Sequence, residues 1–277
     1  MKRNTPSLFY KIIGVGSASG LLYQNNTILI ISDNSSYLYE YQIQNSLLNR
    51  FPLTENAQEN IPKIDKLDFE AIAEYADSIY IFGSGSTKNR NTMMQLNAKT
   101  KAVVQIKELR NLYLKMQSLA NIEPENFNIE GVIFNGHTWF FFHRGNGKYG
   151  KNMVFSIESI NLNDECTINA NEYTLPKIKD ISTGFTDAIL VDDKIYFLAA
   201  AEDSNSTYDD GEVLGSIIGS INLKNLQLEF TKQISDTNKF EGLALYKKSA
   251  EAIAFLLCED KDSADMETAI YLLNLKI

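Results

Sequence analysis

The stretch that decides the fold is Phe69-Glu70-Ala71-Ile72, in which an apolar residue, an acid, a small residue and an aliphatic residue follow one another. Related stretches are Ala18-Ser19-Gly20-Leu21, Ile129-Glu130-Gly131-Val132, Phe185-Thr186-Asp187-Ala188-Ile189 and Phe240-Glu241-Gly242-Leu243. Their markers at positions 20, 70, 130, 187 and 241 are 50, 60, 57 and 54 residues apart. Common propeller repeats are slightly shorter, at roughly 40–50 residues. This spacing predicts five copies of one structural unit.

Each copy opens a series of short segments with the alternating pattern of β-strands. In the second copy we predict strands at Phe69–Glu74, Ser78–Phe82, Thr92–Asn97 and Ala102–Lys107. The third and fourth copies follow the same scheme. Four antiparallel strands per unit are typical of the blade of a β-propeller.

The first and last strands complete this arrangement. The fifth copy supplies only three strands, whereas Ser7–Ile13 is a strand that precedes the first copy. Pairing Ser7–Ile13 with the last blade would remove an open sheet edge and close the ring. We therefore predict an all-β fold over residues 1–277, a single five-bladed β-propeller domain. Its blades are four-stranded and antiparallel, and the N-terminal strand closes the last one.

One segment departs from the strand pattern. Glu108–Ile122 carries apolar residues at spacings of 3, 4 and 3, namely Leu109, Leu112, Met116 and Leu119. This spacing predicts an amphipathic helix inserted between the second and third blades. It would lie either as a wall beside a pocket that contains Arg90 and Arg144, or as a lateral filler against the blade edge.

Composition limits the classes of function. The chain has 277 residues, of which 44% are hydrophobic and 22% charged, and its formal net charge is −9. An acidic chain lacks the basic footprint of a nucleic-acid binder, but it suits a divalent cation as partner. With two cysteines and two histidines, neither a disulfide framework nor a closed zinc site is expected. No apolar run has membrane-spanning length and no signal peptide is recognisable, so we predict a cytoplasmic protein without membrane contact.

The acids of the repeated stretch are the first candidate site. In a propeller the innermost strand of each blade lines the central channel, so Glu70, Glu130, Asp187 and Glu241 are expected to meet at one channel mouth. Converging like charges are costly unless they have partners. A Ca²⁺ ion with oxygen ligands would resolve this repulsion, with Ser19 as a further ligand. Alternatively, the acids accept hydrogen bonds from backbone N–H groups at the blade junctions.

Basic residues in the loops between second and third strands are the second candidate site. Four such residues fall over the second and third blades: Arg90, His143, Arg144 and Lys148. Beside a cation, they would suit an anionic small molecule such as a phosphate or carboxylate on the same face. The other interpretation is a solvated loop rim, which is the usual environment of residues such as Lys148.

The same residues carry a resemblance to known propellers. The phrases around Glu70, Glu130 and Glu241 resemble those of uncharacterised bacterial five-bladed propellers. More distantly, they resemble calcium-activated nucleotidases (soluble apyrases) and esterase-like and phytase-like propellers. The resemblance implies a central Ca²⁺ held by Ser19, Glu70, Glu130 and Glu241. In the fourth blade Asp187 departs from the pattern, and Thr186 is an alternative ligand.

Two functions follow as hypotheses. The first is a metal-dependent phosphoric-ester or anhydride hydrolase acting on phosphate-bearing or other anionic small molecules. Here Ca²⁺ would orient the substrate while Glu70 or Glu130 positions water. The second is a non-catalytic binding module for a glycan, metabolite or protein, with a structural ion. The fold alone does not separate them.

Overall fold

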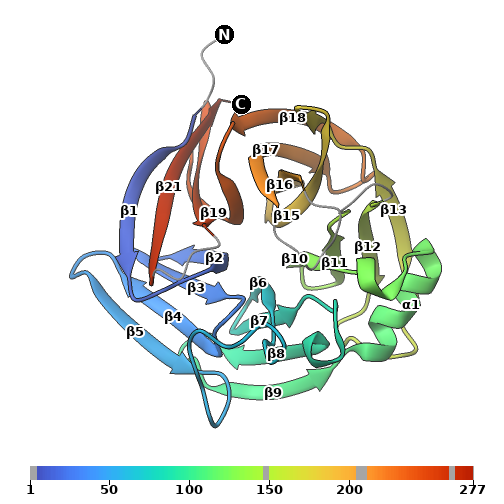
Figure 1. Ribbon diagram of the computed structural model, residues 1–277, viewed down its shortest axis with the longest axis horizontal. Coiled ribbons are helices and arrows are strands. Elements are labelled where there is room, and N and C mark those ends of the chain that lie inside the picture. Colours follow the sequence, from blue (N-terminus) through green and yellow to red (C-terminus); the bar gives the residue numbers. More distant parts are fainter. Residues whose placement is uncertain (1–4, 146–149, 204–210, 262–265, 277) are drawn as a thin grey trace.

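The computed structural model describes residues 5–145, 150–203, 211–261 and 266–276. Five antiparallel sheets stand in a ring around a central channel, and one inner strand of each sheet is nearest the centre (Figure 1). The first blade contains β2(Ala18–Gln24), β3(Thr27–Ser32), β4(Tyr37–Gln42) and β5(Leu47–Pro52). The second contains β6(Phe69–Tyr75), β7(Ser78–Gly83), β8(Thr92–Asn97) and β9(Val103–Glu108). The predicted five-bladed propeller is confirmed.

The remaining blades repeat this order from the centre outwards. The third contains β10(Ile129–Phe134), β11(Thr138–His143), β12(Asn152–Glu158) and β13(Asn169–Tyr173). The fourth contains β15(Ile181–Val191), β16(Lys194–Asp203), β17(Glu212–Asn222) and β18(Leu228–Ser235), with the two-residue β14(Lys177–Ile178) added beside β15. The fifth contains β19(Lys239–Lys248), β20(Ala252–Asp260) and β21(Glu267–Lys276). Its outer strand is β1(Ser7–Ile13), which pairs antiparallel with β21 as predicted.

The core lies between blades rather than within them. The buried apolar side chains of the described residues form five clusters, and each cluster joins two neighbouring blades. At the junction of the second and third blades, the rings of Phe134 and Trp139 stack with centroids 4.0 Å apart. Because each sheet has apolar side chains on both faces, neighbouring blades bury one another's faces and hold the ring together.

The inserted helix α1(Arg110–Ala120) lies at the outer edge of the ring, beside the third blade (Figure 1). Tyr113 and Met116 are buried in the cluster between the second and third blades. Asn111 donates a hydrogen bond to Asp164 Oδ2 over 2.7 Å, and Lys115 donates to the Asp164 carbonyl in the loop after β12. The helix is therefore a lateral filler, and the expectation of a wall beside the channel mouth is wrong. Among the described helices, none is both long and apolar enough for a membrane span.

Candidate metal centre

All five inner strands share one irregularity near their start. In each pairing with the second strand, a single residue is skipped by the register, which is a β-bulge. The skipped residues are Ser19, Glu70, Glu130, Thr186 and Glu241. A bulge turns its side chain out of the regular alternation. The equivalents of Glu70 are therefore Ser19 in the first blade and Thr186 in the fourth, so the predicted markers at Gly20 and Asp187 are each one residue too late.

Two further positions of each blade lie beside the bulge. One is the residue two before it: Ser17, Asp68, Asn128, Gly184 and Lys239. The other position is on the second strand of the blade or directly after it. The residue before each bulge pairs with a residue of that strand, and the next residue in sequence is Asp33, Ser84, Arg144, Ala200 or Asp260. Because the blades are arranged in a ring, the charged residues at these three positions come together at one mouth of the channel. We call this end the upper mouth.

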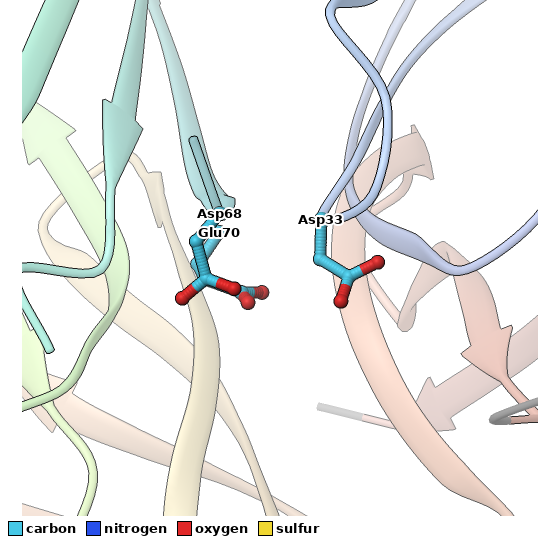
Figure 2. A group of neighbouring side chains, drawn as sticks. All are labelled: Asp33, Asp68 and Glu70. Atoms are coloured by element: carbon cyan, nitrogen blue, oxygen red, sulfur yellow. The ribbon is translucent and has the colours of Figure 1, made fainter. Parts of the chain in front are cut away.

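At the upper mouth three carboxylates form a group that could hold a metal ion. One carboxylate oxygen from each of Asp33, Asp68 and Glu70 lies within 4.8 Å of those of the other two. Asp33 follows β3 in the first blade and faces Asp68 and Glu70 of the second blade across a gap (Figure 2). Ca²⁺ binds oxygen at 2.3–2.6 Å, so two of its ligands are at most about 5 Å apart. The spacing of the three oxygens fits such an ion.

The three carboxylates differ in their partners. Asp68 Oδ2 accepts hydrogen bonds from Ser84 Oγ over 2.5 Å and from Arg90 Nη1 over 2.9 Å. Asp33 Oδ2 is paired with Lys66, while Asp33 Oδ1 is buried without a hydrogen-bond partner. Glu70 has neither a hydrogen bond nor an ion pair with any described residue. Since two cations face three carboxylates, one negative charge is left uncompensated.

This arrangement shifts the pKa of Glu70 upwards. Burial raises it well above its usual range, and the neighbouring charges of Asp68, Glu130, Glu241 and Asp33 raise it further. Burial also raises the pKa of Asp33, against the opposing effect of Lys66. Both carboxyls would be stabilised as anions by an added cation.

The opposite wall of the mouth is a buried ion-pair network centred on Arg144 and Lys239. Arg144 Nη2 lies 2.7 Å from Glu202 Oε2, and its Nη1 lies 3.3 Å from Glu130 Oε1 and 3.9 Å from Glu241 Oε1. Lys239 Nζ lies 2.9 Å from Glu241 Oε1 and 3.7 Å from Glu202 Oε2. Burial raises the pKa of Glu241 to about 7 although both cations lower it. Glu130 and Glu241 thus have cationic partners that Glu70 lacks.

Three predicted ligand positions make contacts between blades instead. Ser19 Oγ donates to the Phe69 carbonyl over 2.5 Å, and Thr186 Oγ1 donates to the Phe240 carbonyl over 2.6 Å. Asp187 accepts hydrogen bonds of 2.7 Å from the N–H groups of Ala188 and Leu243. The contacts of Asp187 match the alternative that the sequence left open, in which an acid accepts hydrogen bonds from backbone N–H groups at a blade junction. Ser19 and Thr186 instead donate to backbone carbonyls of the neighbouring blade.

The predicted anion-binding residues are also engaged within the protein. Arg90 is bonded to Asp68, to Ser86 Oγ at 2.9 Å and to the Lys63 carbonyl at 2.9 Å. His143 is buried, with Nδ1 2.9 Å from the Lys151 carbonyl and Nε2 3.1 Å from the Asn126 carbonyl. Burial lowers its pKa to about 4. Lys148 falls outside the described residues.

Sequence reasoning missed Asp33, Asp68, Lys66 and Lys239. The signal was present two residues before each repeated acid, where Asp68, Asn128 and Lys239 stand at equivalent positions. Asp33 lies in the loop between the second and third strands of the first blade, which the repeat pattern places on the same face, but its approach to Asp68 and Glu70 of another blade depends on the strand register.

Solved structures that resemble this chain have little sequence identity to it. Glutaminyl cyclase from Myxococcus xanthus is 8% identical with a TM-score of 0.56, and the match covers 98% of this chain and 97% of that one. The calcium-binding protein regucalcin from Agrobacterium tumefaciens is 9% identical with a TM-score of 0.51, covering 97% and 94%. Hydrazine synthase from Kuenenia stuttgartiensis is 9% identical with a TM-score of 0.47, and 90% of this chain spans only 57% of that one.

A comparison with curated proteins found no match. The model of one protein family matches residues 14–276, which is nearly the whole described chain. The chain therefore belongs to DUF6929, a family of unknown function.

Proposed function

We propose that this protein binds a divalent cation, Ca²⁺, at the upper mouth of its channel through Asp33, Asp68 and Glu70. The observation that carries the proposal is that Glu70 has no hydrogen bond or ion pair with the described residues and lies within 4.8 Å of two other carboxylates. A buried oxygen of Asp33 also lacks a partner. Hard oxygen ligands of this kind suit Ca²⁺, which takes 6–8 of them, so the ion would also bind water or a ligand from the channel. Regucalcin, a calcium-binding protein of similar fold, is consistent with this proposal.

Calorimetric titration with CaCl₂ tests the site directly. Wild type should bind one ion, and Glu70→Gln should weaken binding at least tenfold because an anionic ligand is lost. Glu74→Gln is the matched control, since Glu74 lies on the same strand outside the group. Absence of saturable Ca²⁺ binding by wild type would contradict the proposal.

Glu130→Gln tests the wider ligand set that the sequence predicted. Because Glu130 is already paired with Arg144, we expect Ca²⁺ affinity to stay within about threefold of wild type. A larger loss would add Glu130 to the ligands. Thermal unfolding gives an independent readout, because an ion at 100 times its Kd adds roughly 2.7 kcal/mol to the stability of the native state.

A second candidate function is metal-dependent hydrolysis of a phosphate-bearing or other anionic small molecule. It is favoured by Glu241, whose pKa of about 7 suits a general base at neutral pH. The substrate anion would bind beside the cation, since Arg90 and Arg144 are already paired with carboxylates. In this proposal Glu70 holds the ion, and Glu130, which the sequence predicted as catalytic, keeps Arg144 in place.

The test is phosphate release from nucleoside diphosphates in the presence of Ca²⁺ or EDTA. Calcium-dependent release that falls in Glu241→Gln, through kcat more than KM, would support the hydrolase. Ca²⁺ binding without turnover on a panel of phosphates and lactones would favour the alternative, a non-catalytic module that binds its ligand beside the ion.

A further inference from the structure

The lower half of the channel contains a cavity of a different kind. Its volume is about 280 Å³, and it is lined by the inner strands of all five blades beyond their bulges. The lining segments are Leu22–Tyr23, Ile72–Glu74, Val132–Phe134, Ala188–Leu190 and Leu243–Leu245. These residues are almost all aliphatic or aromatic, in contrast to the charged upper mouth.

Glu74 is the exception in this lining. It is the single carboxylate among the residues that line the cavity. Within the described part of the chain it forms no hydrogen bond and no ion pair. Burial raises the pKa of Glu74, while the more distant charge of Lys101 lowers it. An unpaired carboxylate in an apolar wall is costly and gains most from a cationic partner.

The surroundings of Glu74 favour a cation that is organic. Tyr23 and Phe134 line the same cavity, and aromatic residues attract ammonium groups. The residues that line the cavity include no Lys, Arg or His, so an anionic ligand would meet the carboxylate of Glu74 without a counter-charge. A neutral apolar ligand would cover the half-buried Glu74 without giving it a counter-charge, and a hydrated metal ion would gain nothing from the aliphatic walls.

We propose that this lower cavity binds a small organic amine, with its ammonium group on Glu74 and its hydrocarbon part against the aliphatic and aromatic wall. An engineered apolar cavity of about 150 Å³ holds one benzene molecule. The present cavity of about 280 Å³ therefore suits a ligand of one ring with a short alkyl chain. This site does not depend on the proposed cation site, because Glu70 and Glu74 are four residues, or about 13 Å, apart along the strand.

Titration with phenethylamine tests the proposal, followed by calorimetry and by NMR of isoleucine methyl groups. Saturable binding that shifts the methyl signals of Ile72, Ile133 and Ile189, which line the cavity, is the expected result. Two probes of similar shape serve as controls. Phenylpropionate should bind at least tenfold more weakly because it carries a negative charge, and phenethyl alcohol should be intermediate.

Two variants identify the groups responsible. Glu74→Gln should weaken phenethylamine binding at least tenfold and bring it level with the alcohol. Ala244→Leu should weaken both probes, because its larger side chain occupies the cavity. Glu70→Gln, the matched change four residues earlier, should leave amine affinity within about twofold while weakening Ca²⁺ binding at least tenfold.

The proposal is overturned if wild type shows no saturable phenethylamine binding or shifts no cavity methyl. It is also overturned if phenylpropionate binds equally well, or if folded Glu74→Gln keeps wild-type affinity for the amine. Circular dichroism melts of both cavity variants establish that they are folded.

Discussion

Glu70 and Glu130 occupy the same bulge position in adjacent blades, and only Glu130 has a cation against it. Arg144 Nη1 lies 3.3 Å from Glu130 Oε1, whereas Glu70 has no ion pair with a described residue. Arg144 stands at the position that Ser84 holds in the blade of Glu70. The identity of this one repeat position therefore decides which carboxylate remains available to an external ligand.

Lys66 is expected to compete with a metal ion for Asp33. It pairs with Asp33 Oδ2, and both side chains are largely buried. Replacing it in Lys66→Met frees a carboxylate oxygen and removes a positive charge beside the site, so Ca²⁺ should bind at least tenfold more tightly. Lys194→Met is the control, because Lys194 pairs with Glu229 in the fourth blade. Weaker Ca²⁺ binding by Lys66→Met would mean that Lys66 organises the site rather than occupying it.

Cation binding should strengthen as pH rises. The raised pKa of Glu70 means that this carboxyl retains a proton at a pH where a free glutamate has lost it. Ca²⁺ must displace that proton to bind. In the pH range where Glu70 is protonated, the release of one proton therefore raises the Ca²⁺ affinity by up to tenfold for each unit of increase in pH. Titrations at pH 6 and 8 in buffers of different ionisation enthalpy measure both effects. An affinity independent of pH would exclude Glu70 as a titrating ligand.

Removal of Arg144 should destabilise the fold most at high pH. Arg144→Met leaves Glu130, Glu241 and Glu202 without their shared cation, and breaking a buried pair costs about 3–5 kcal/mol. Burial raises the pKa of Glu202, but the charges of Arg144 and Lys239 outweigh burial and lower this pKa below its usual value. A depressed carboxyl pKa contributes stability above the unfolded-state pKa and loses it on acidification.

The free energy of unfolding that Arg144→Met loses relative to wild type should accordingly be large at pH 8 and smaller near pH 4. Urea unfolding at both pH values measures it. Arg50→Met provides the comparison, because the Arg50–Glu59 pair is partly exposed and should contribute at most about 1 kcal/mol. An equal deficit at both pH values would show that Arg144 acts through packing rather than charge.

The bulge hydroxyls should contribute to stability and not to metal affinity. Ser19→Ala leaves the buried Phe69 carbonyl without this donor, which should cost about 1–3 kcal/mol. Thr186→Val, which does the same at the Phe240 carbonyl, should behave alike. Calorimetric scans combined with Ca²⁺ titration separate the two roles. A tenfold loss of Ca²⁺ affinity in Ser19→Ala alone would restore Ser19 as a ligand.

Much of the fold could be predicted because the repeat is written in local sequence. In the second, third and fifth copies an apolar residue, an acid and a small residue mark the bulge, and the small residue lies where blades approach closely. A side-chain carbon on Gly131 would lie 3.0 Å from the backbone nitrogen of Ala188 in the next blade. The fourth copy was misaligned because Asp187 stands at this small-residue position, where its carboxylate binds backbone N–H groups instead.

The site was harder to predict than the fold. Repetition indicates that Glu70, Glu130 and Glu241 converge, but it does not indicate which of them carries a counter-charge. That depends on residues such as Arg144 and Lys239, which come from different strands and blades. The sequence repeat shows what the blades have in common, whereas the group of Asp33, Asp68 and Glu70 depends on residues that differ between blades.

The pairing of β1 with β21 has a consequence for synthesis on the ribosome. Ser7 meets Leu272 across 265 residues of chain, so β1 leaves the ribosome long before its partner β21 has been made. Until then β1 is an unpaired edge, exposed to other nascent chains. Each of the first four blades can form as its own strands emerge, but the fifth cannot. Closure of the ring is therefore the step at which a chaperone holding the N-terminal strand would change the yield.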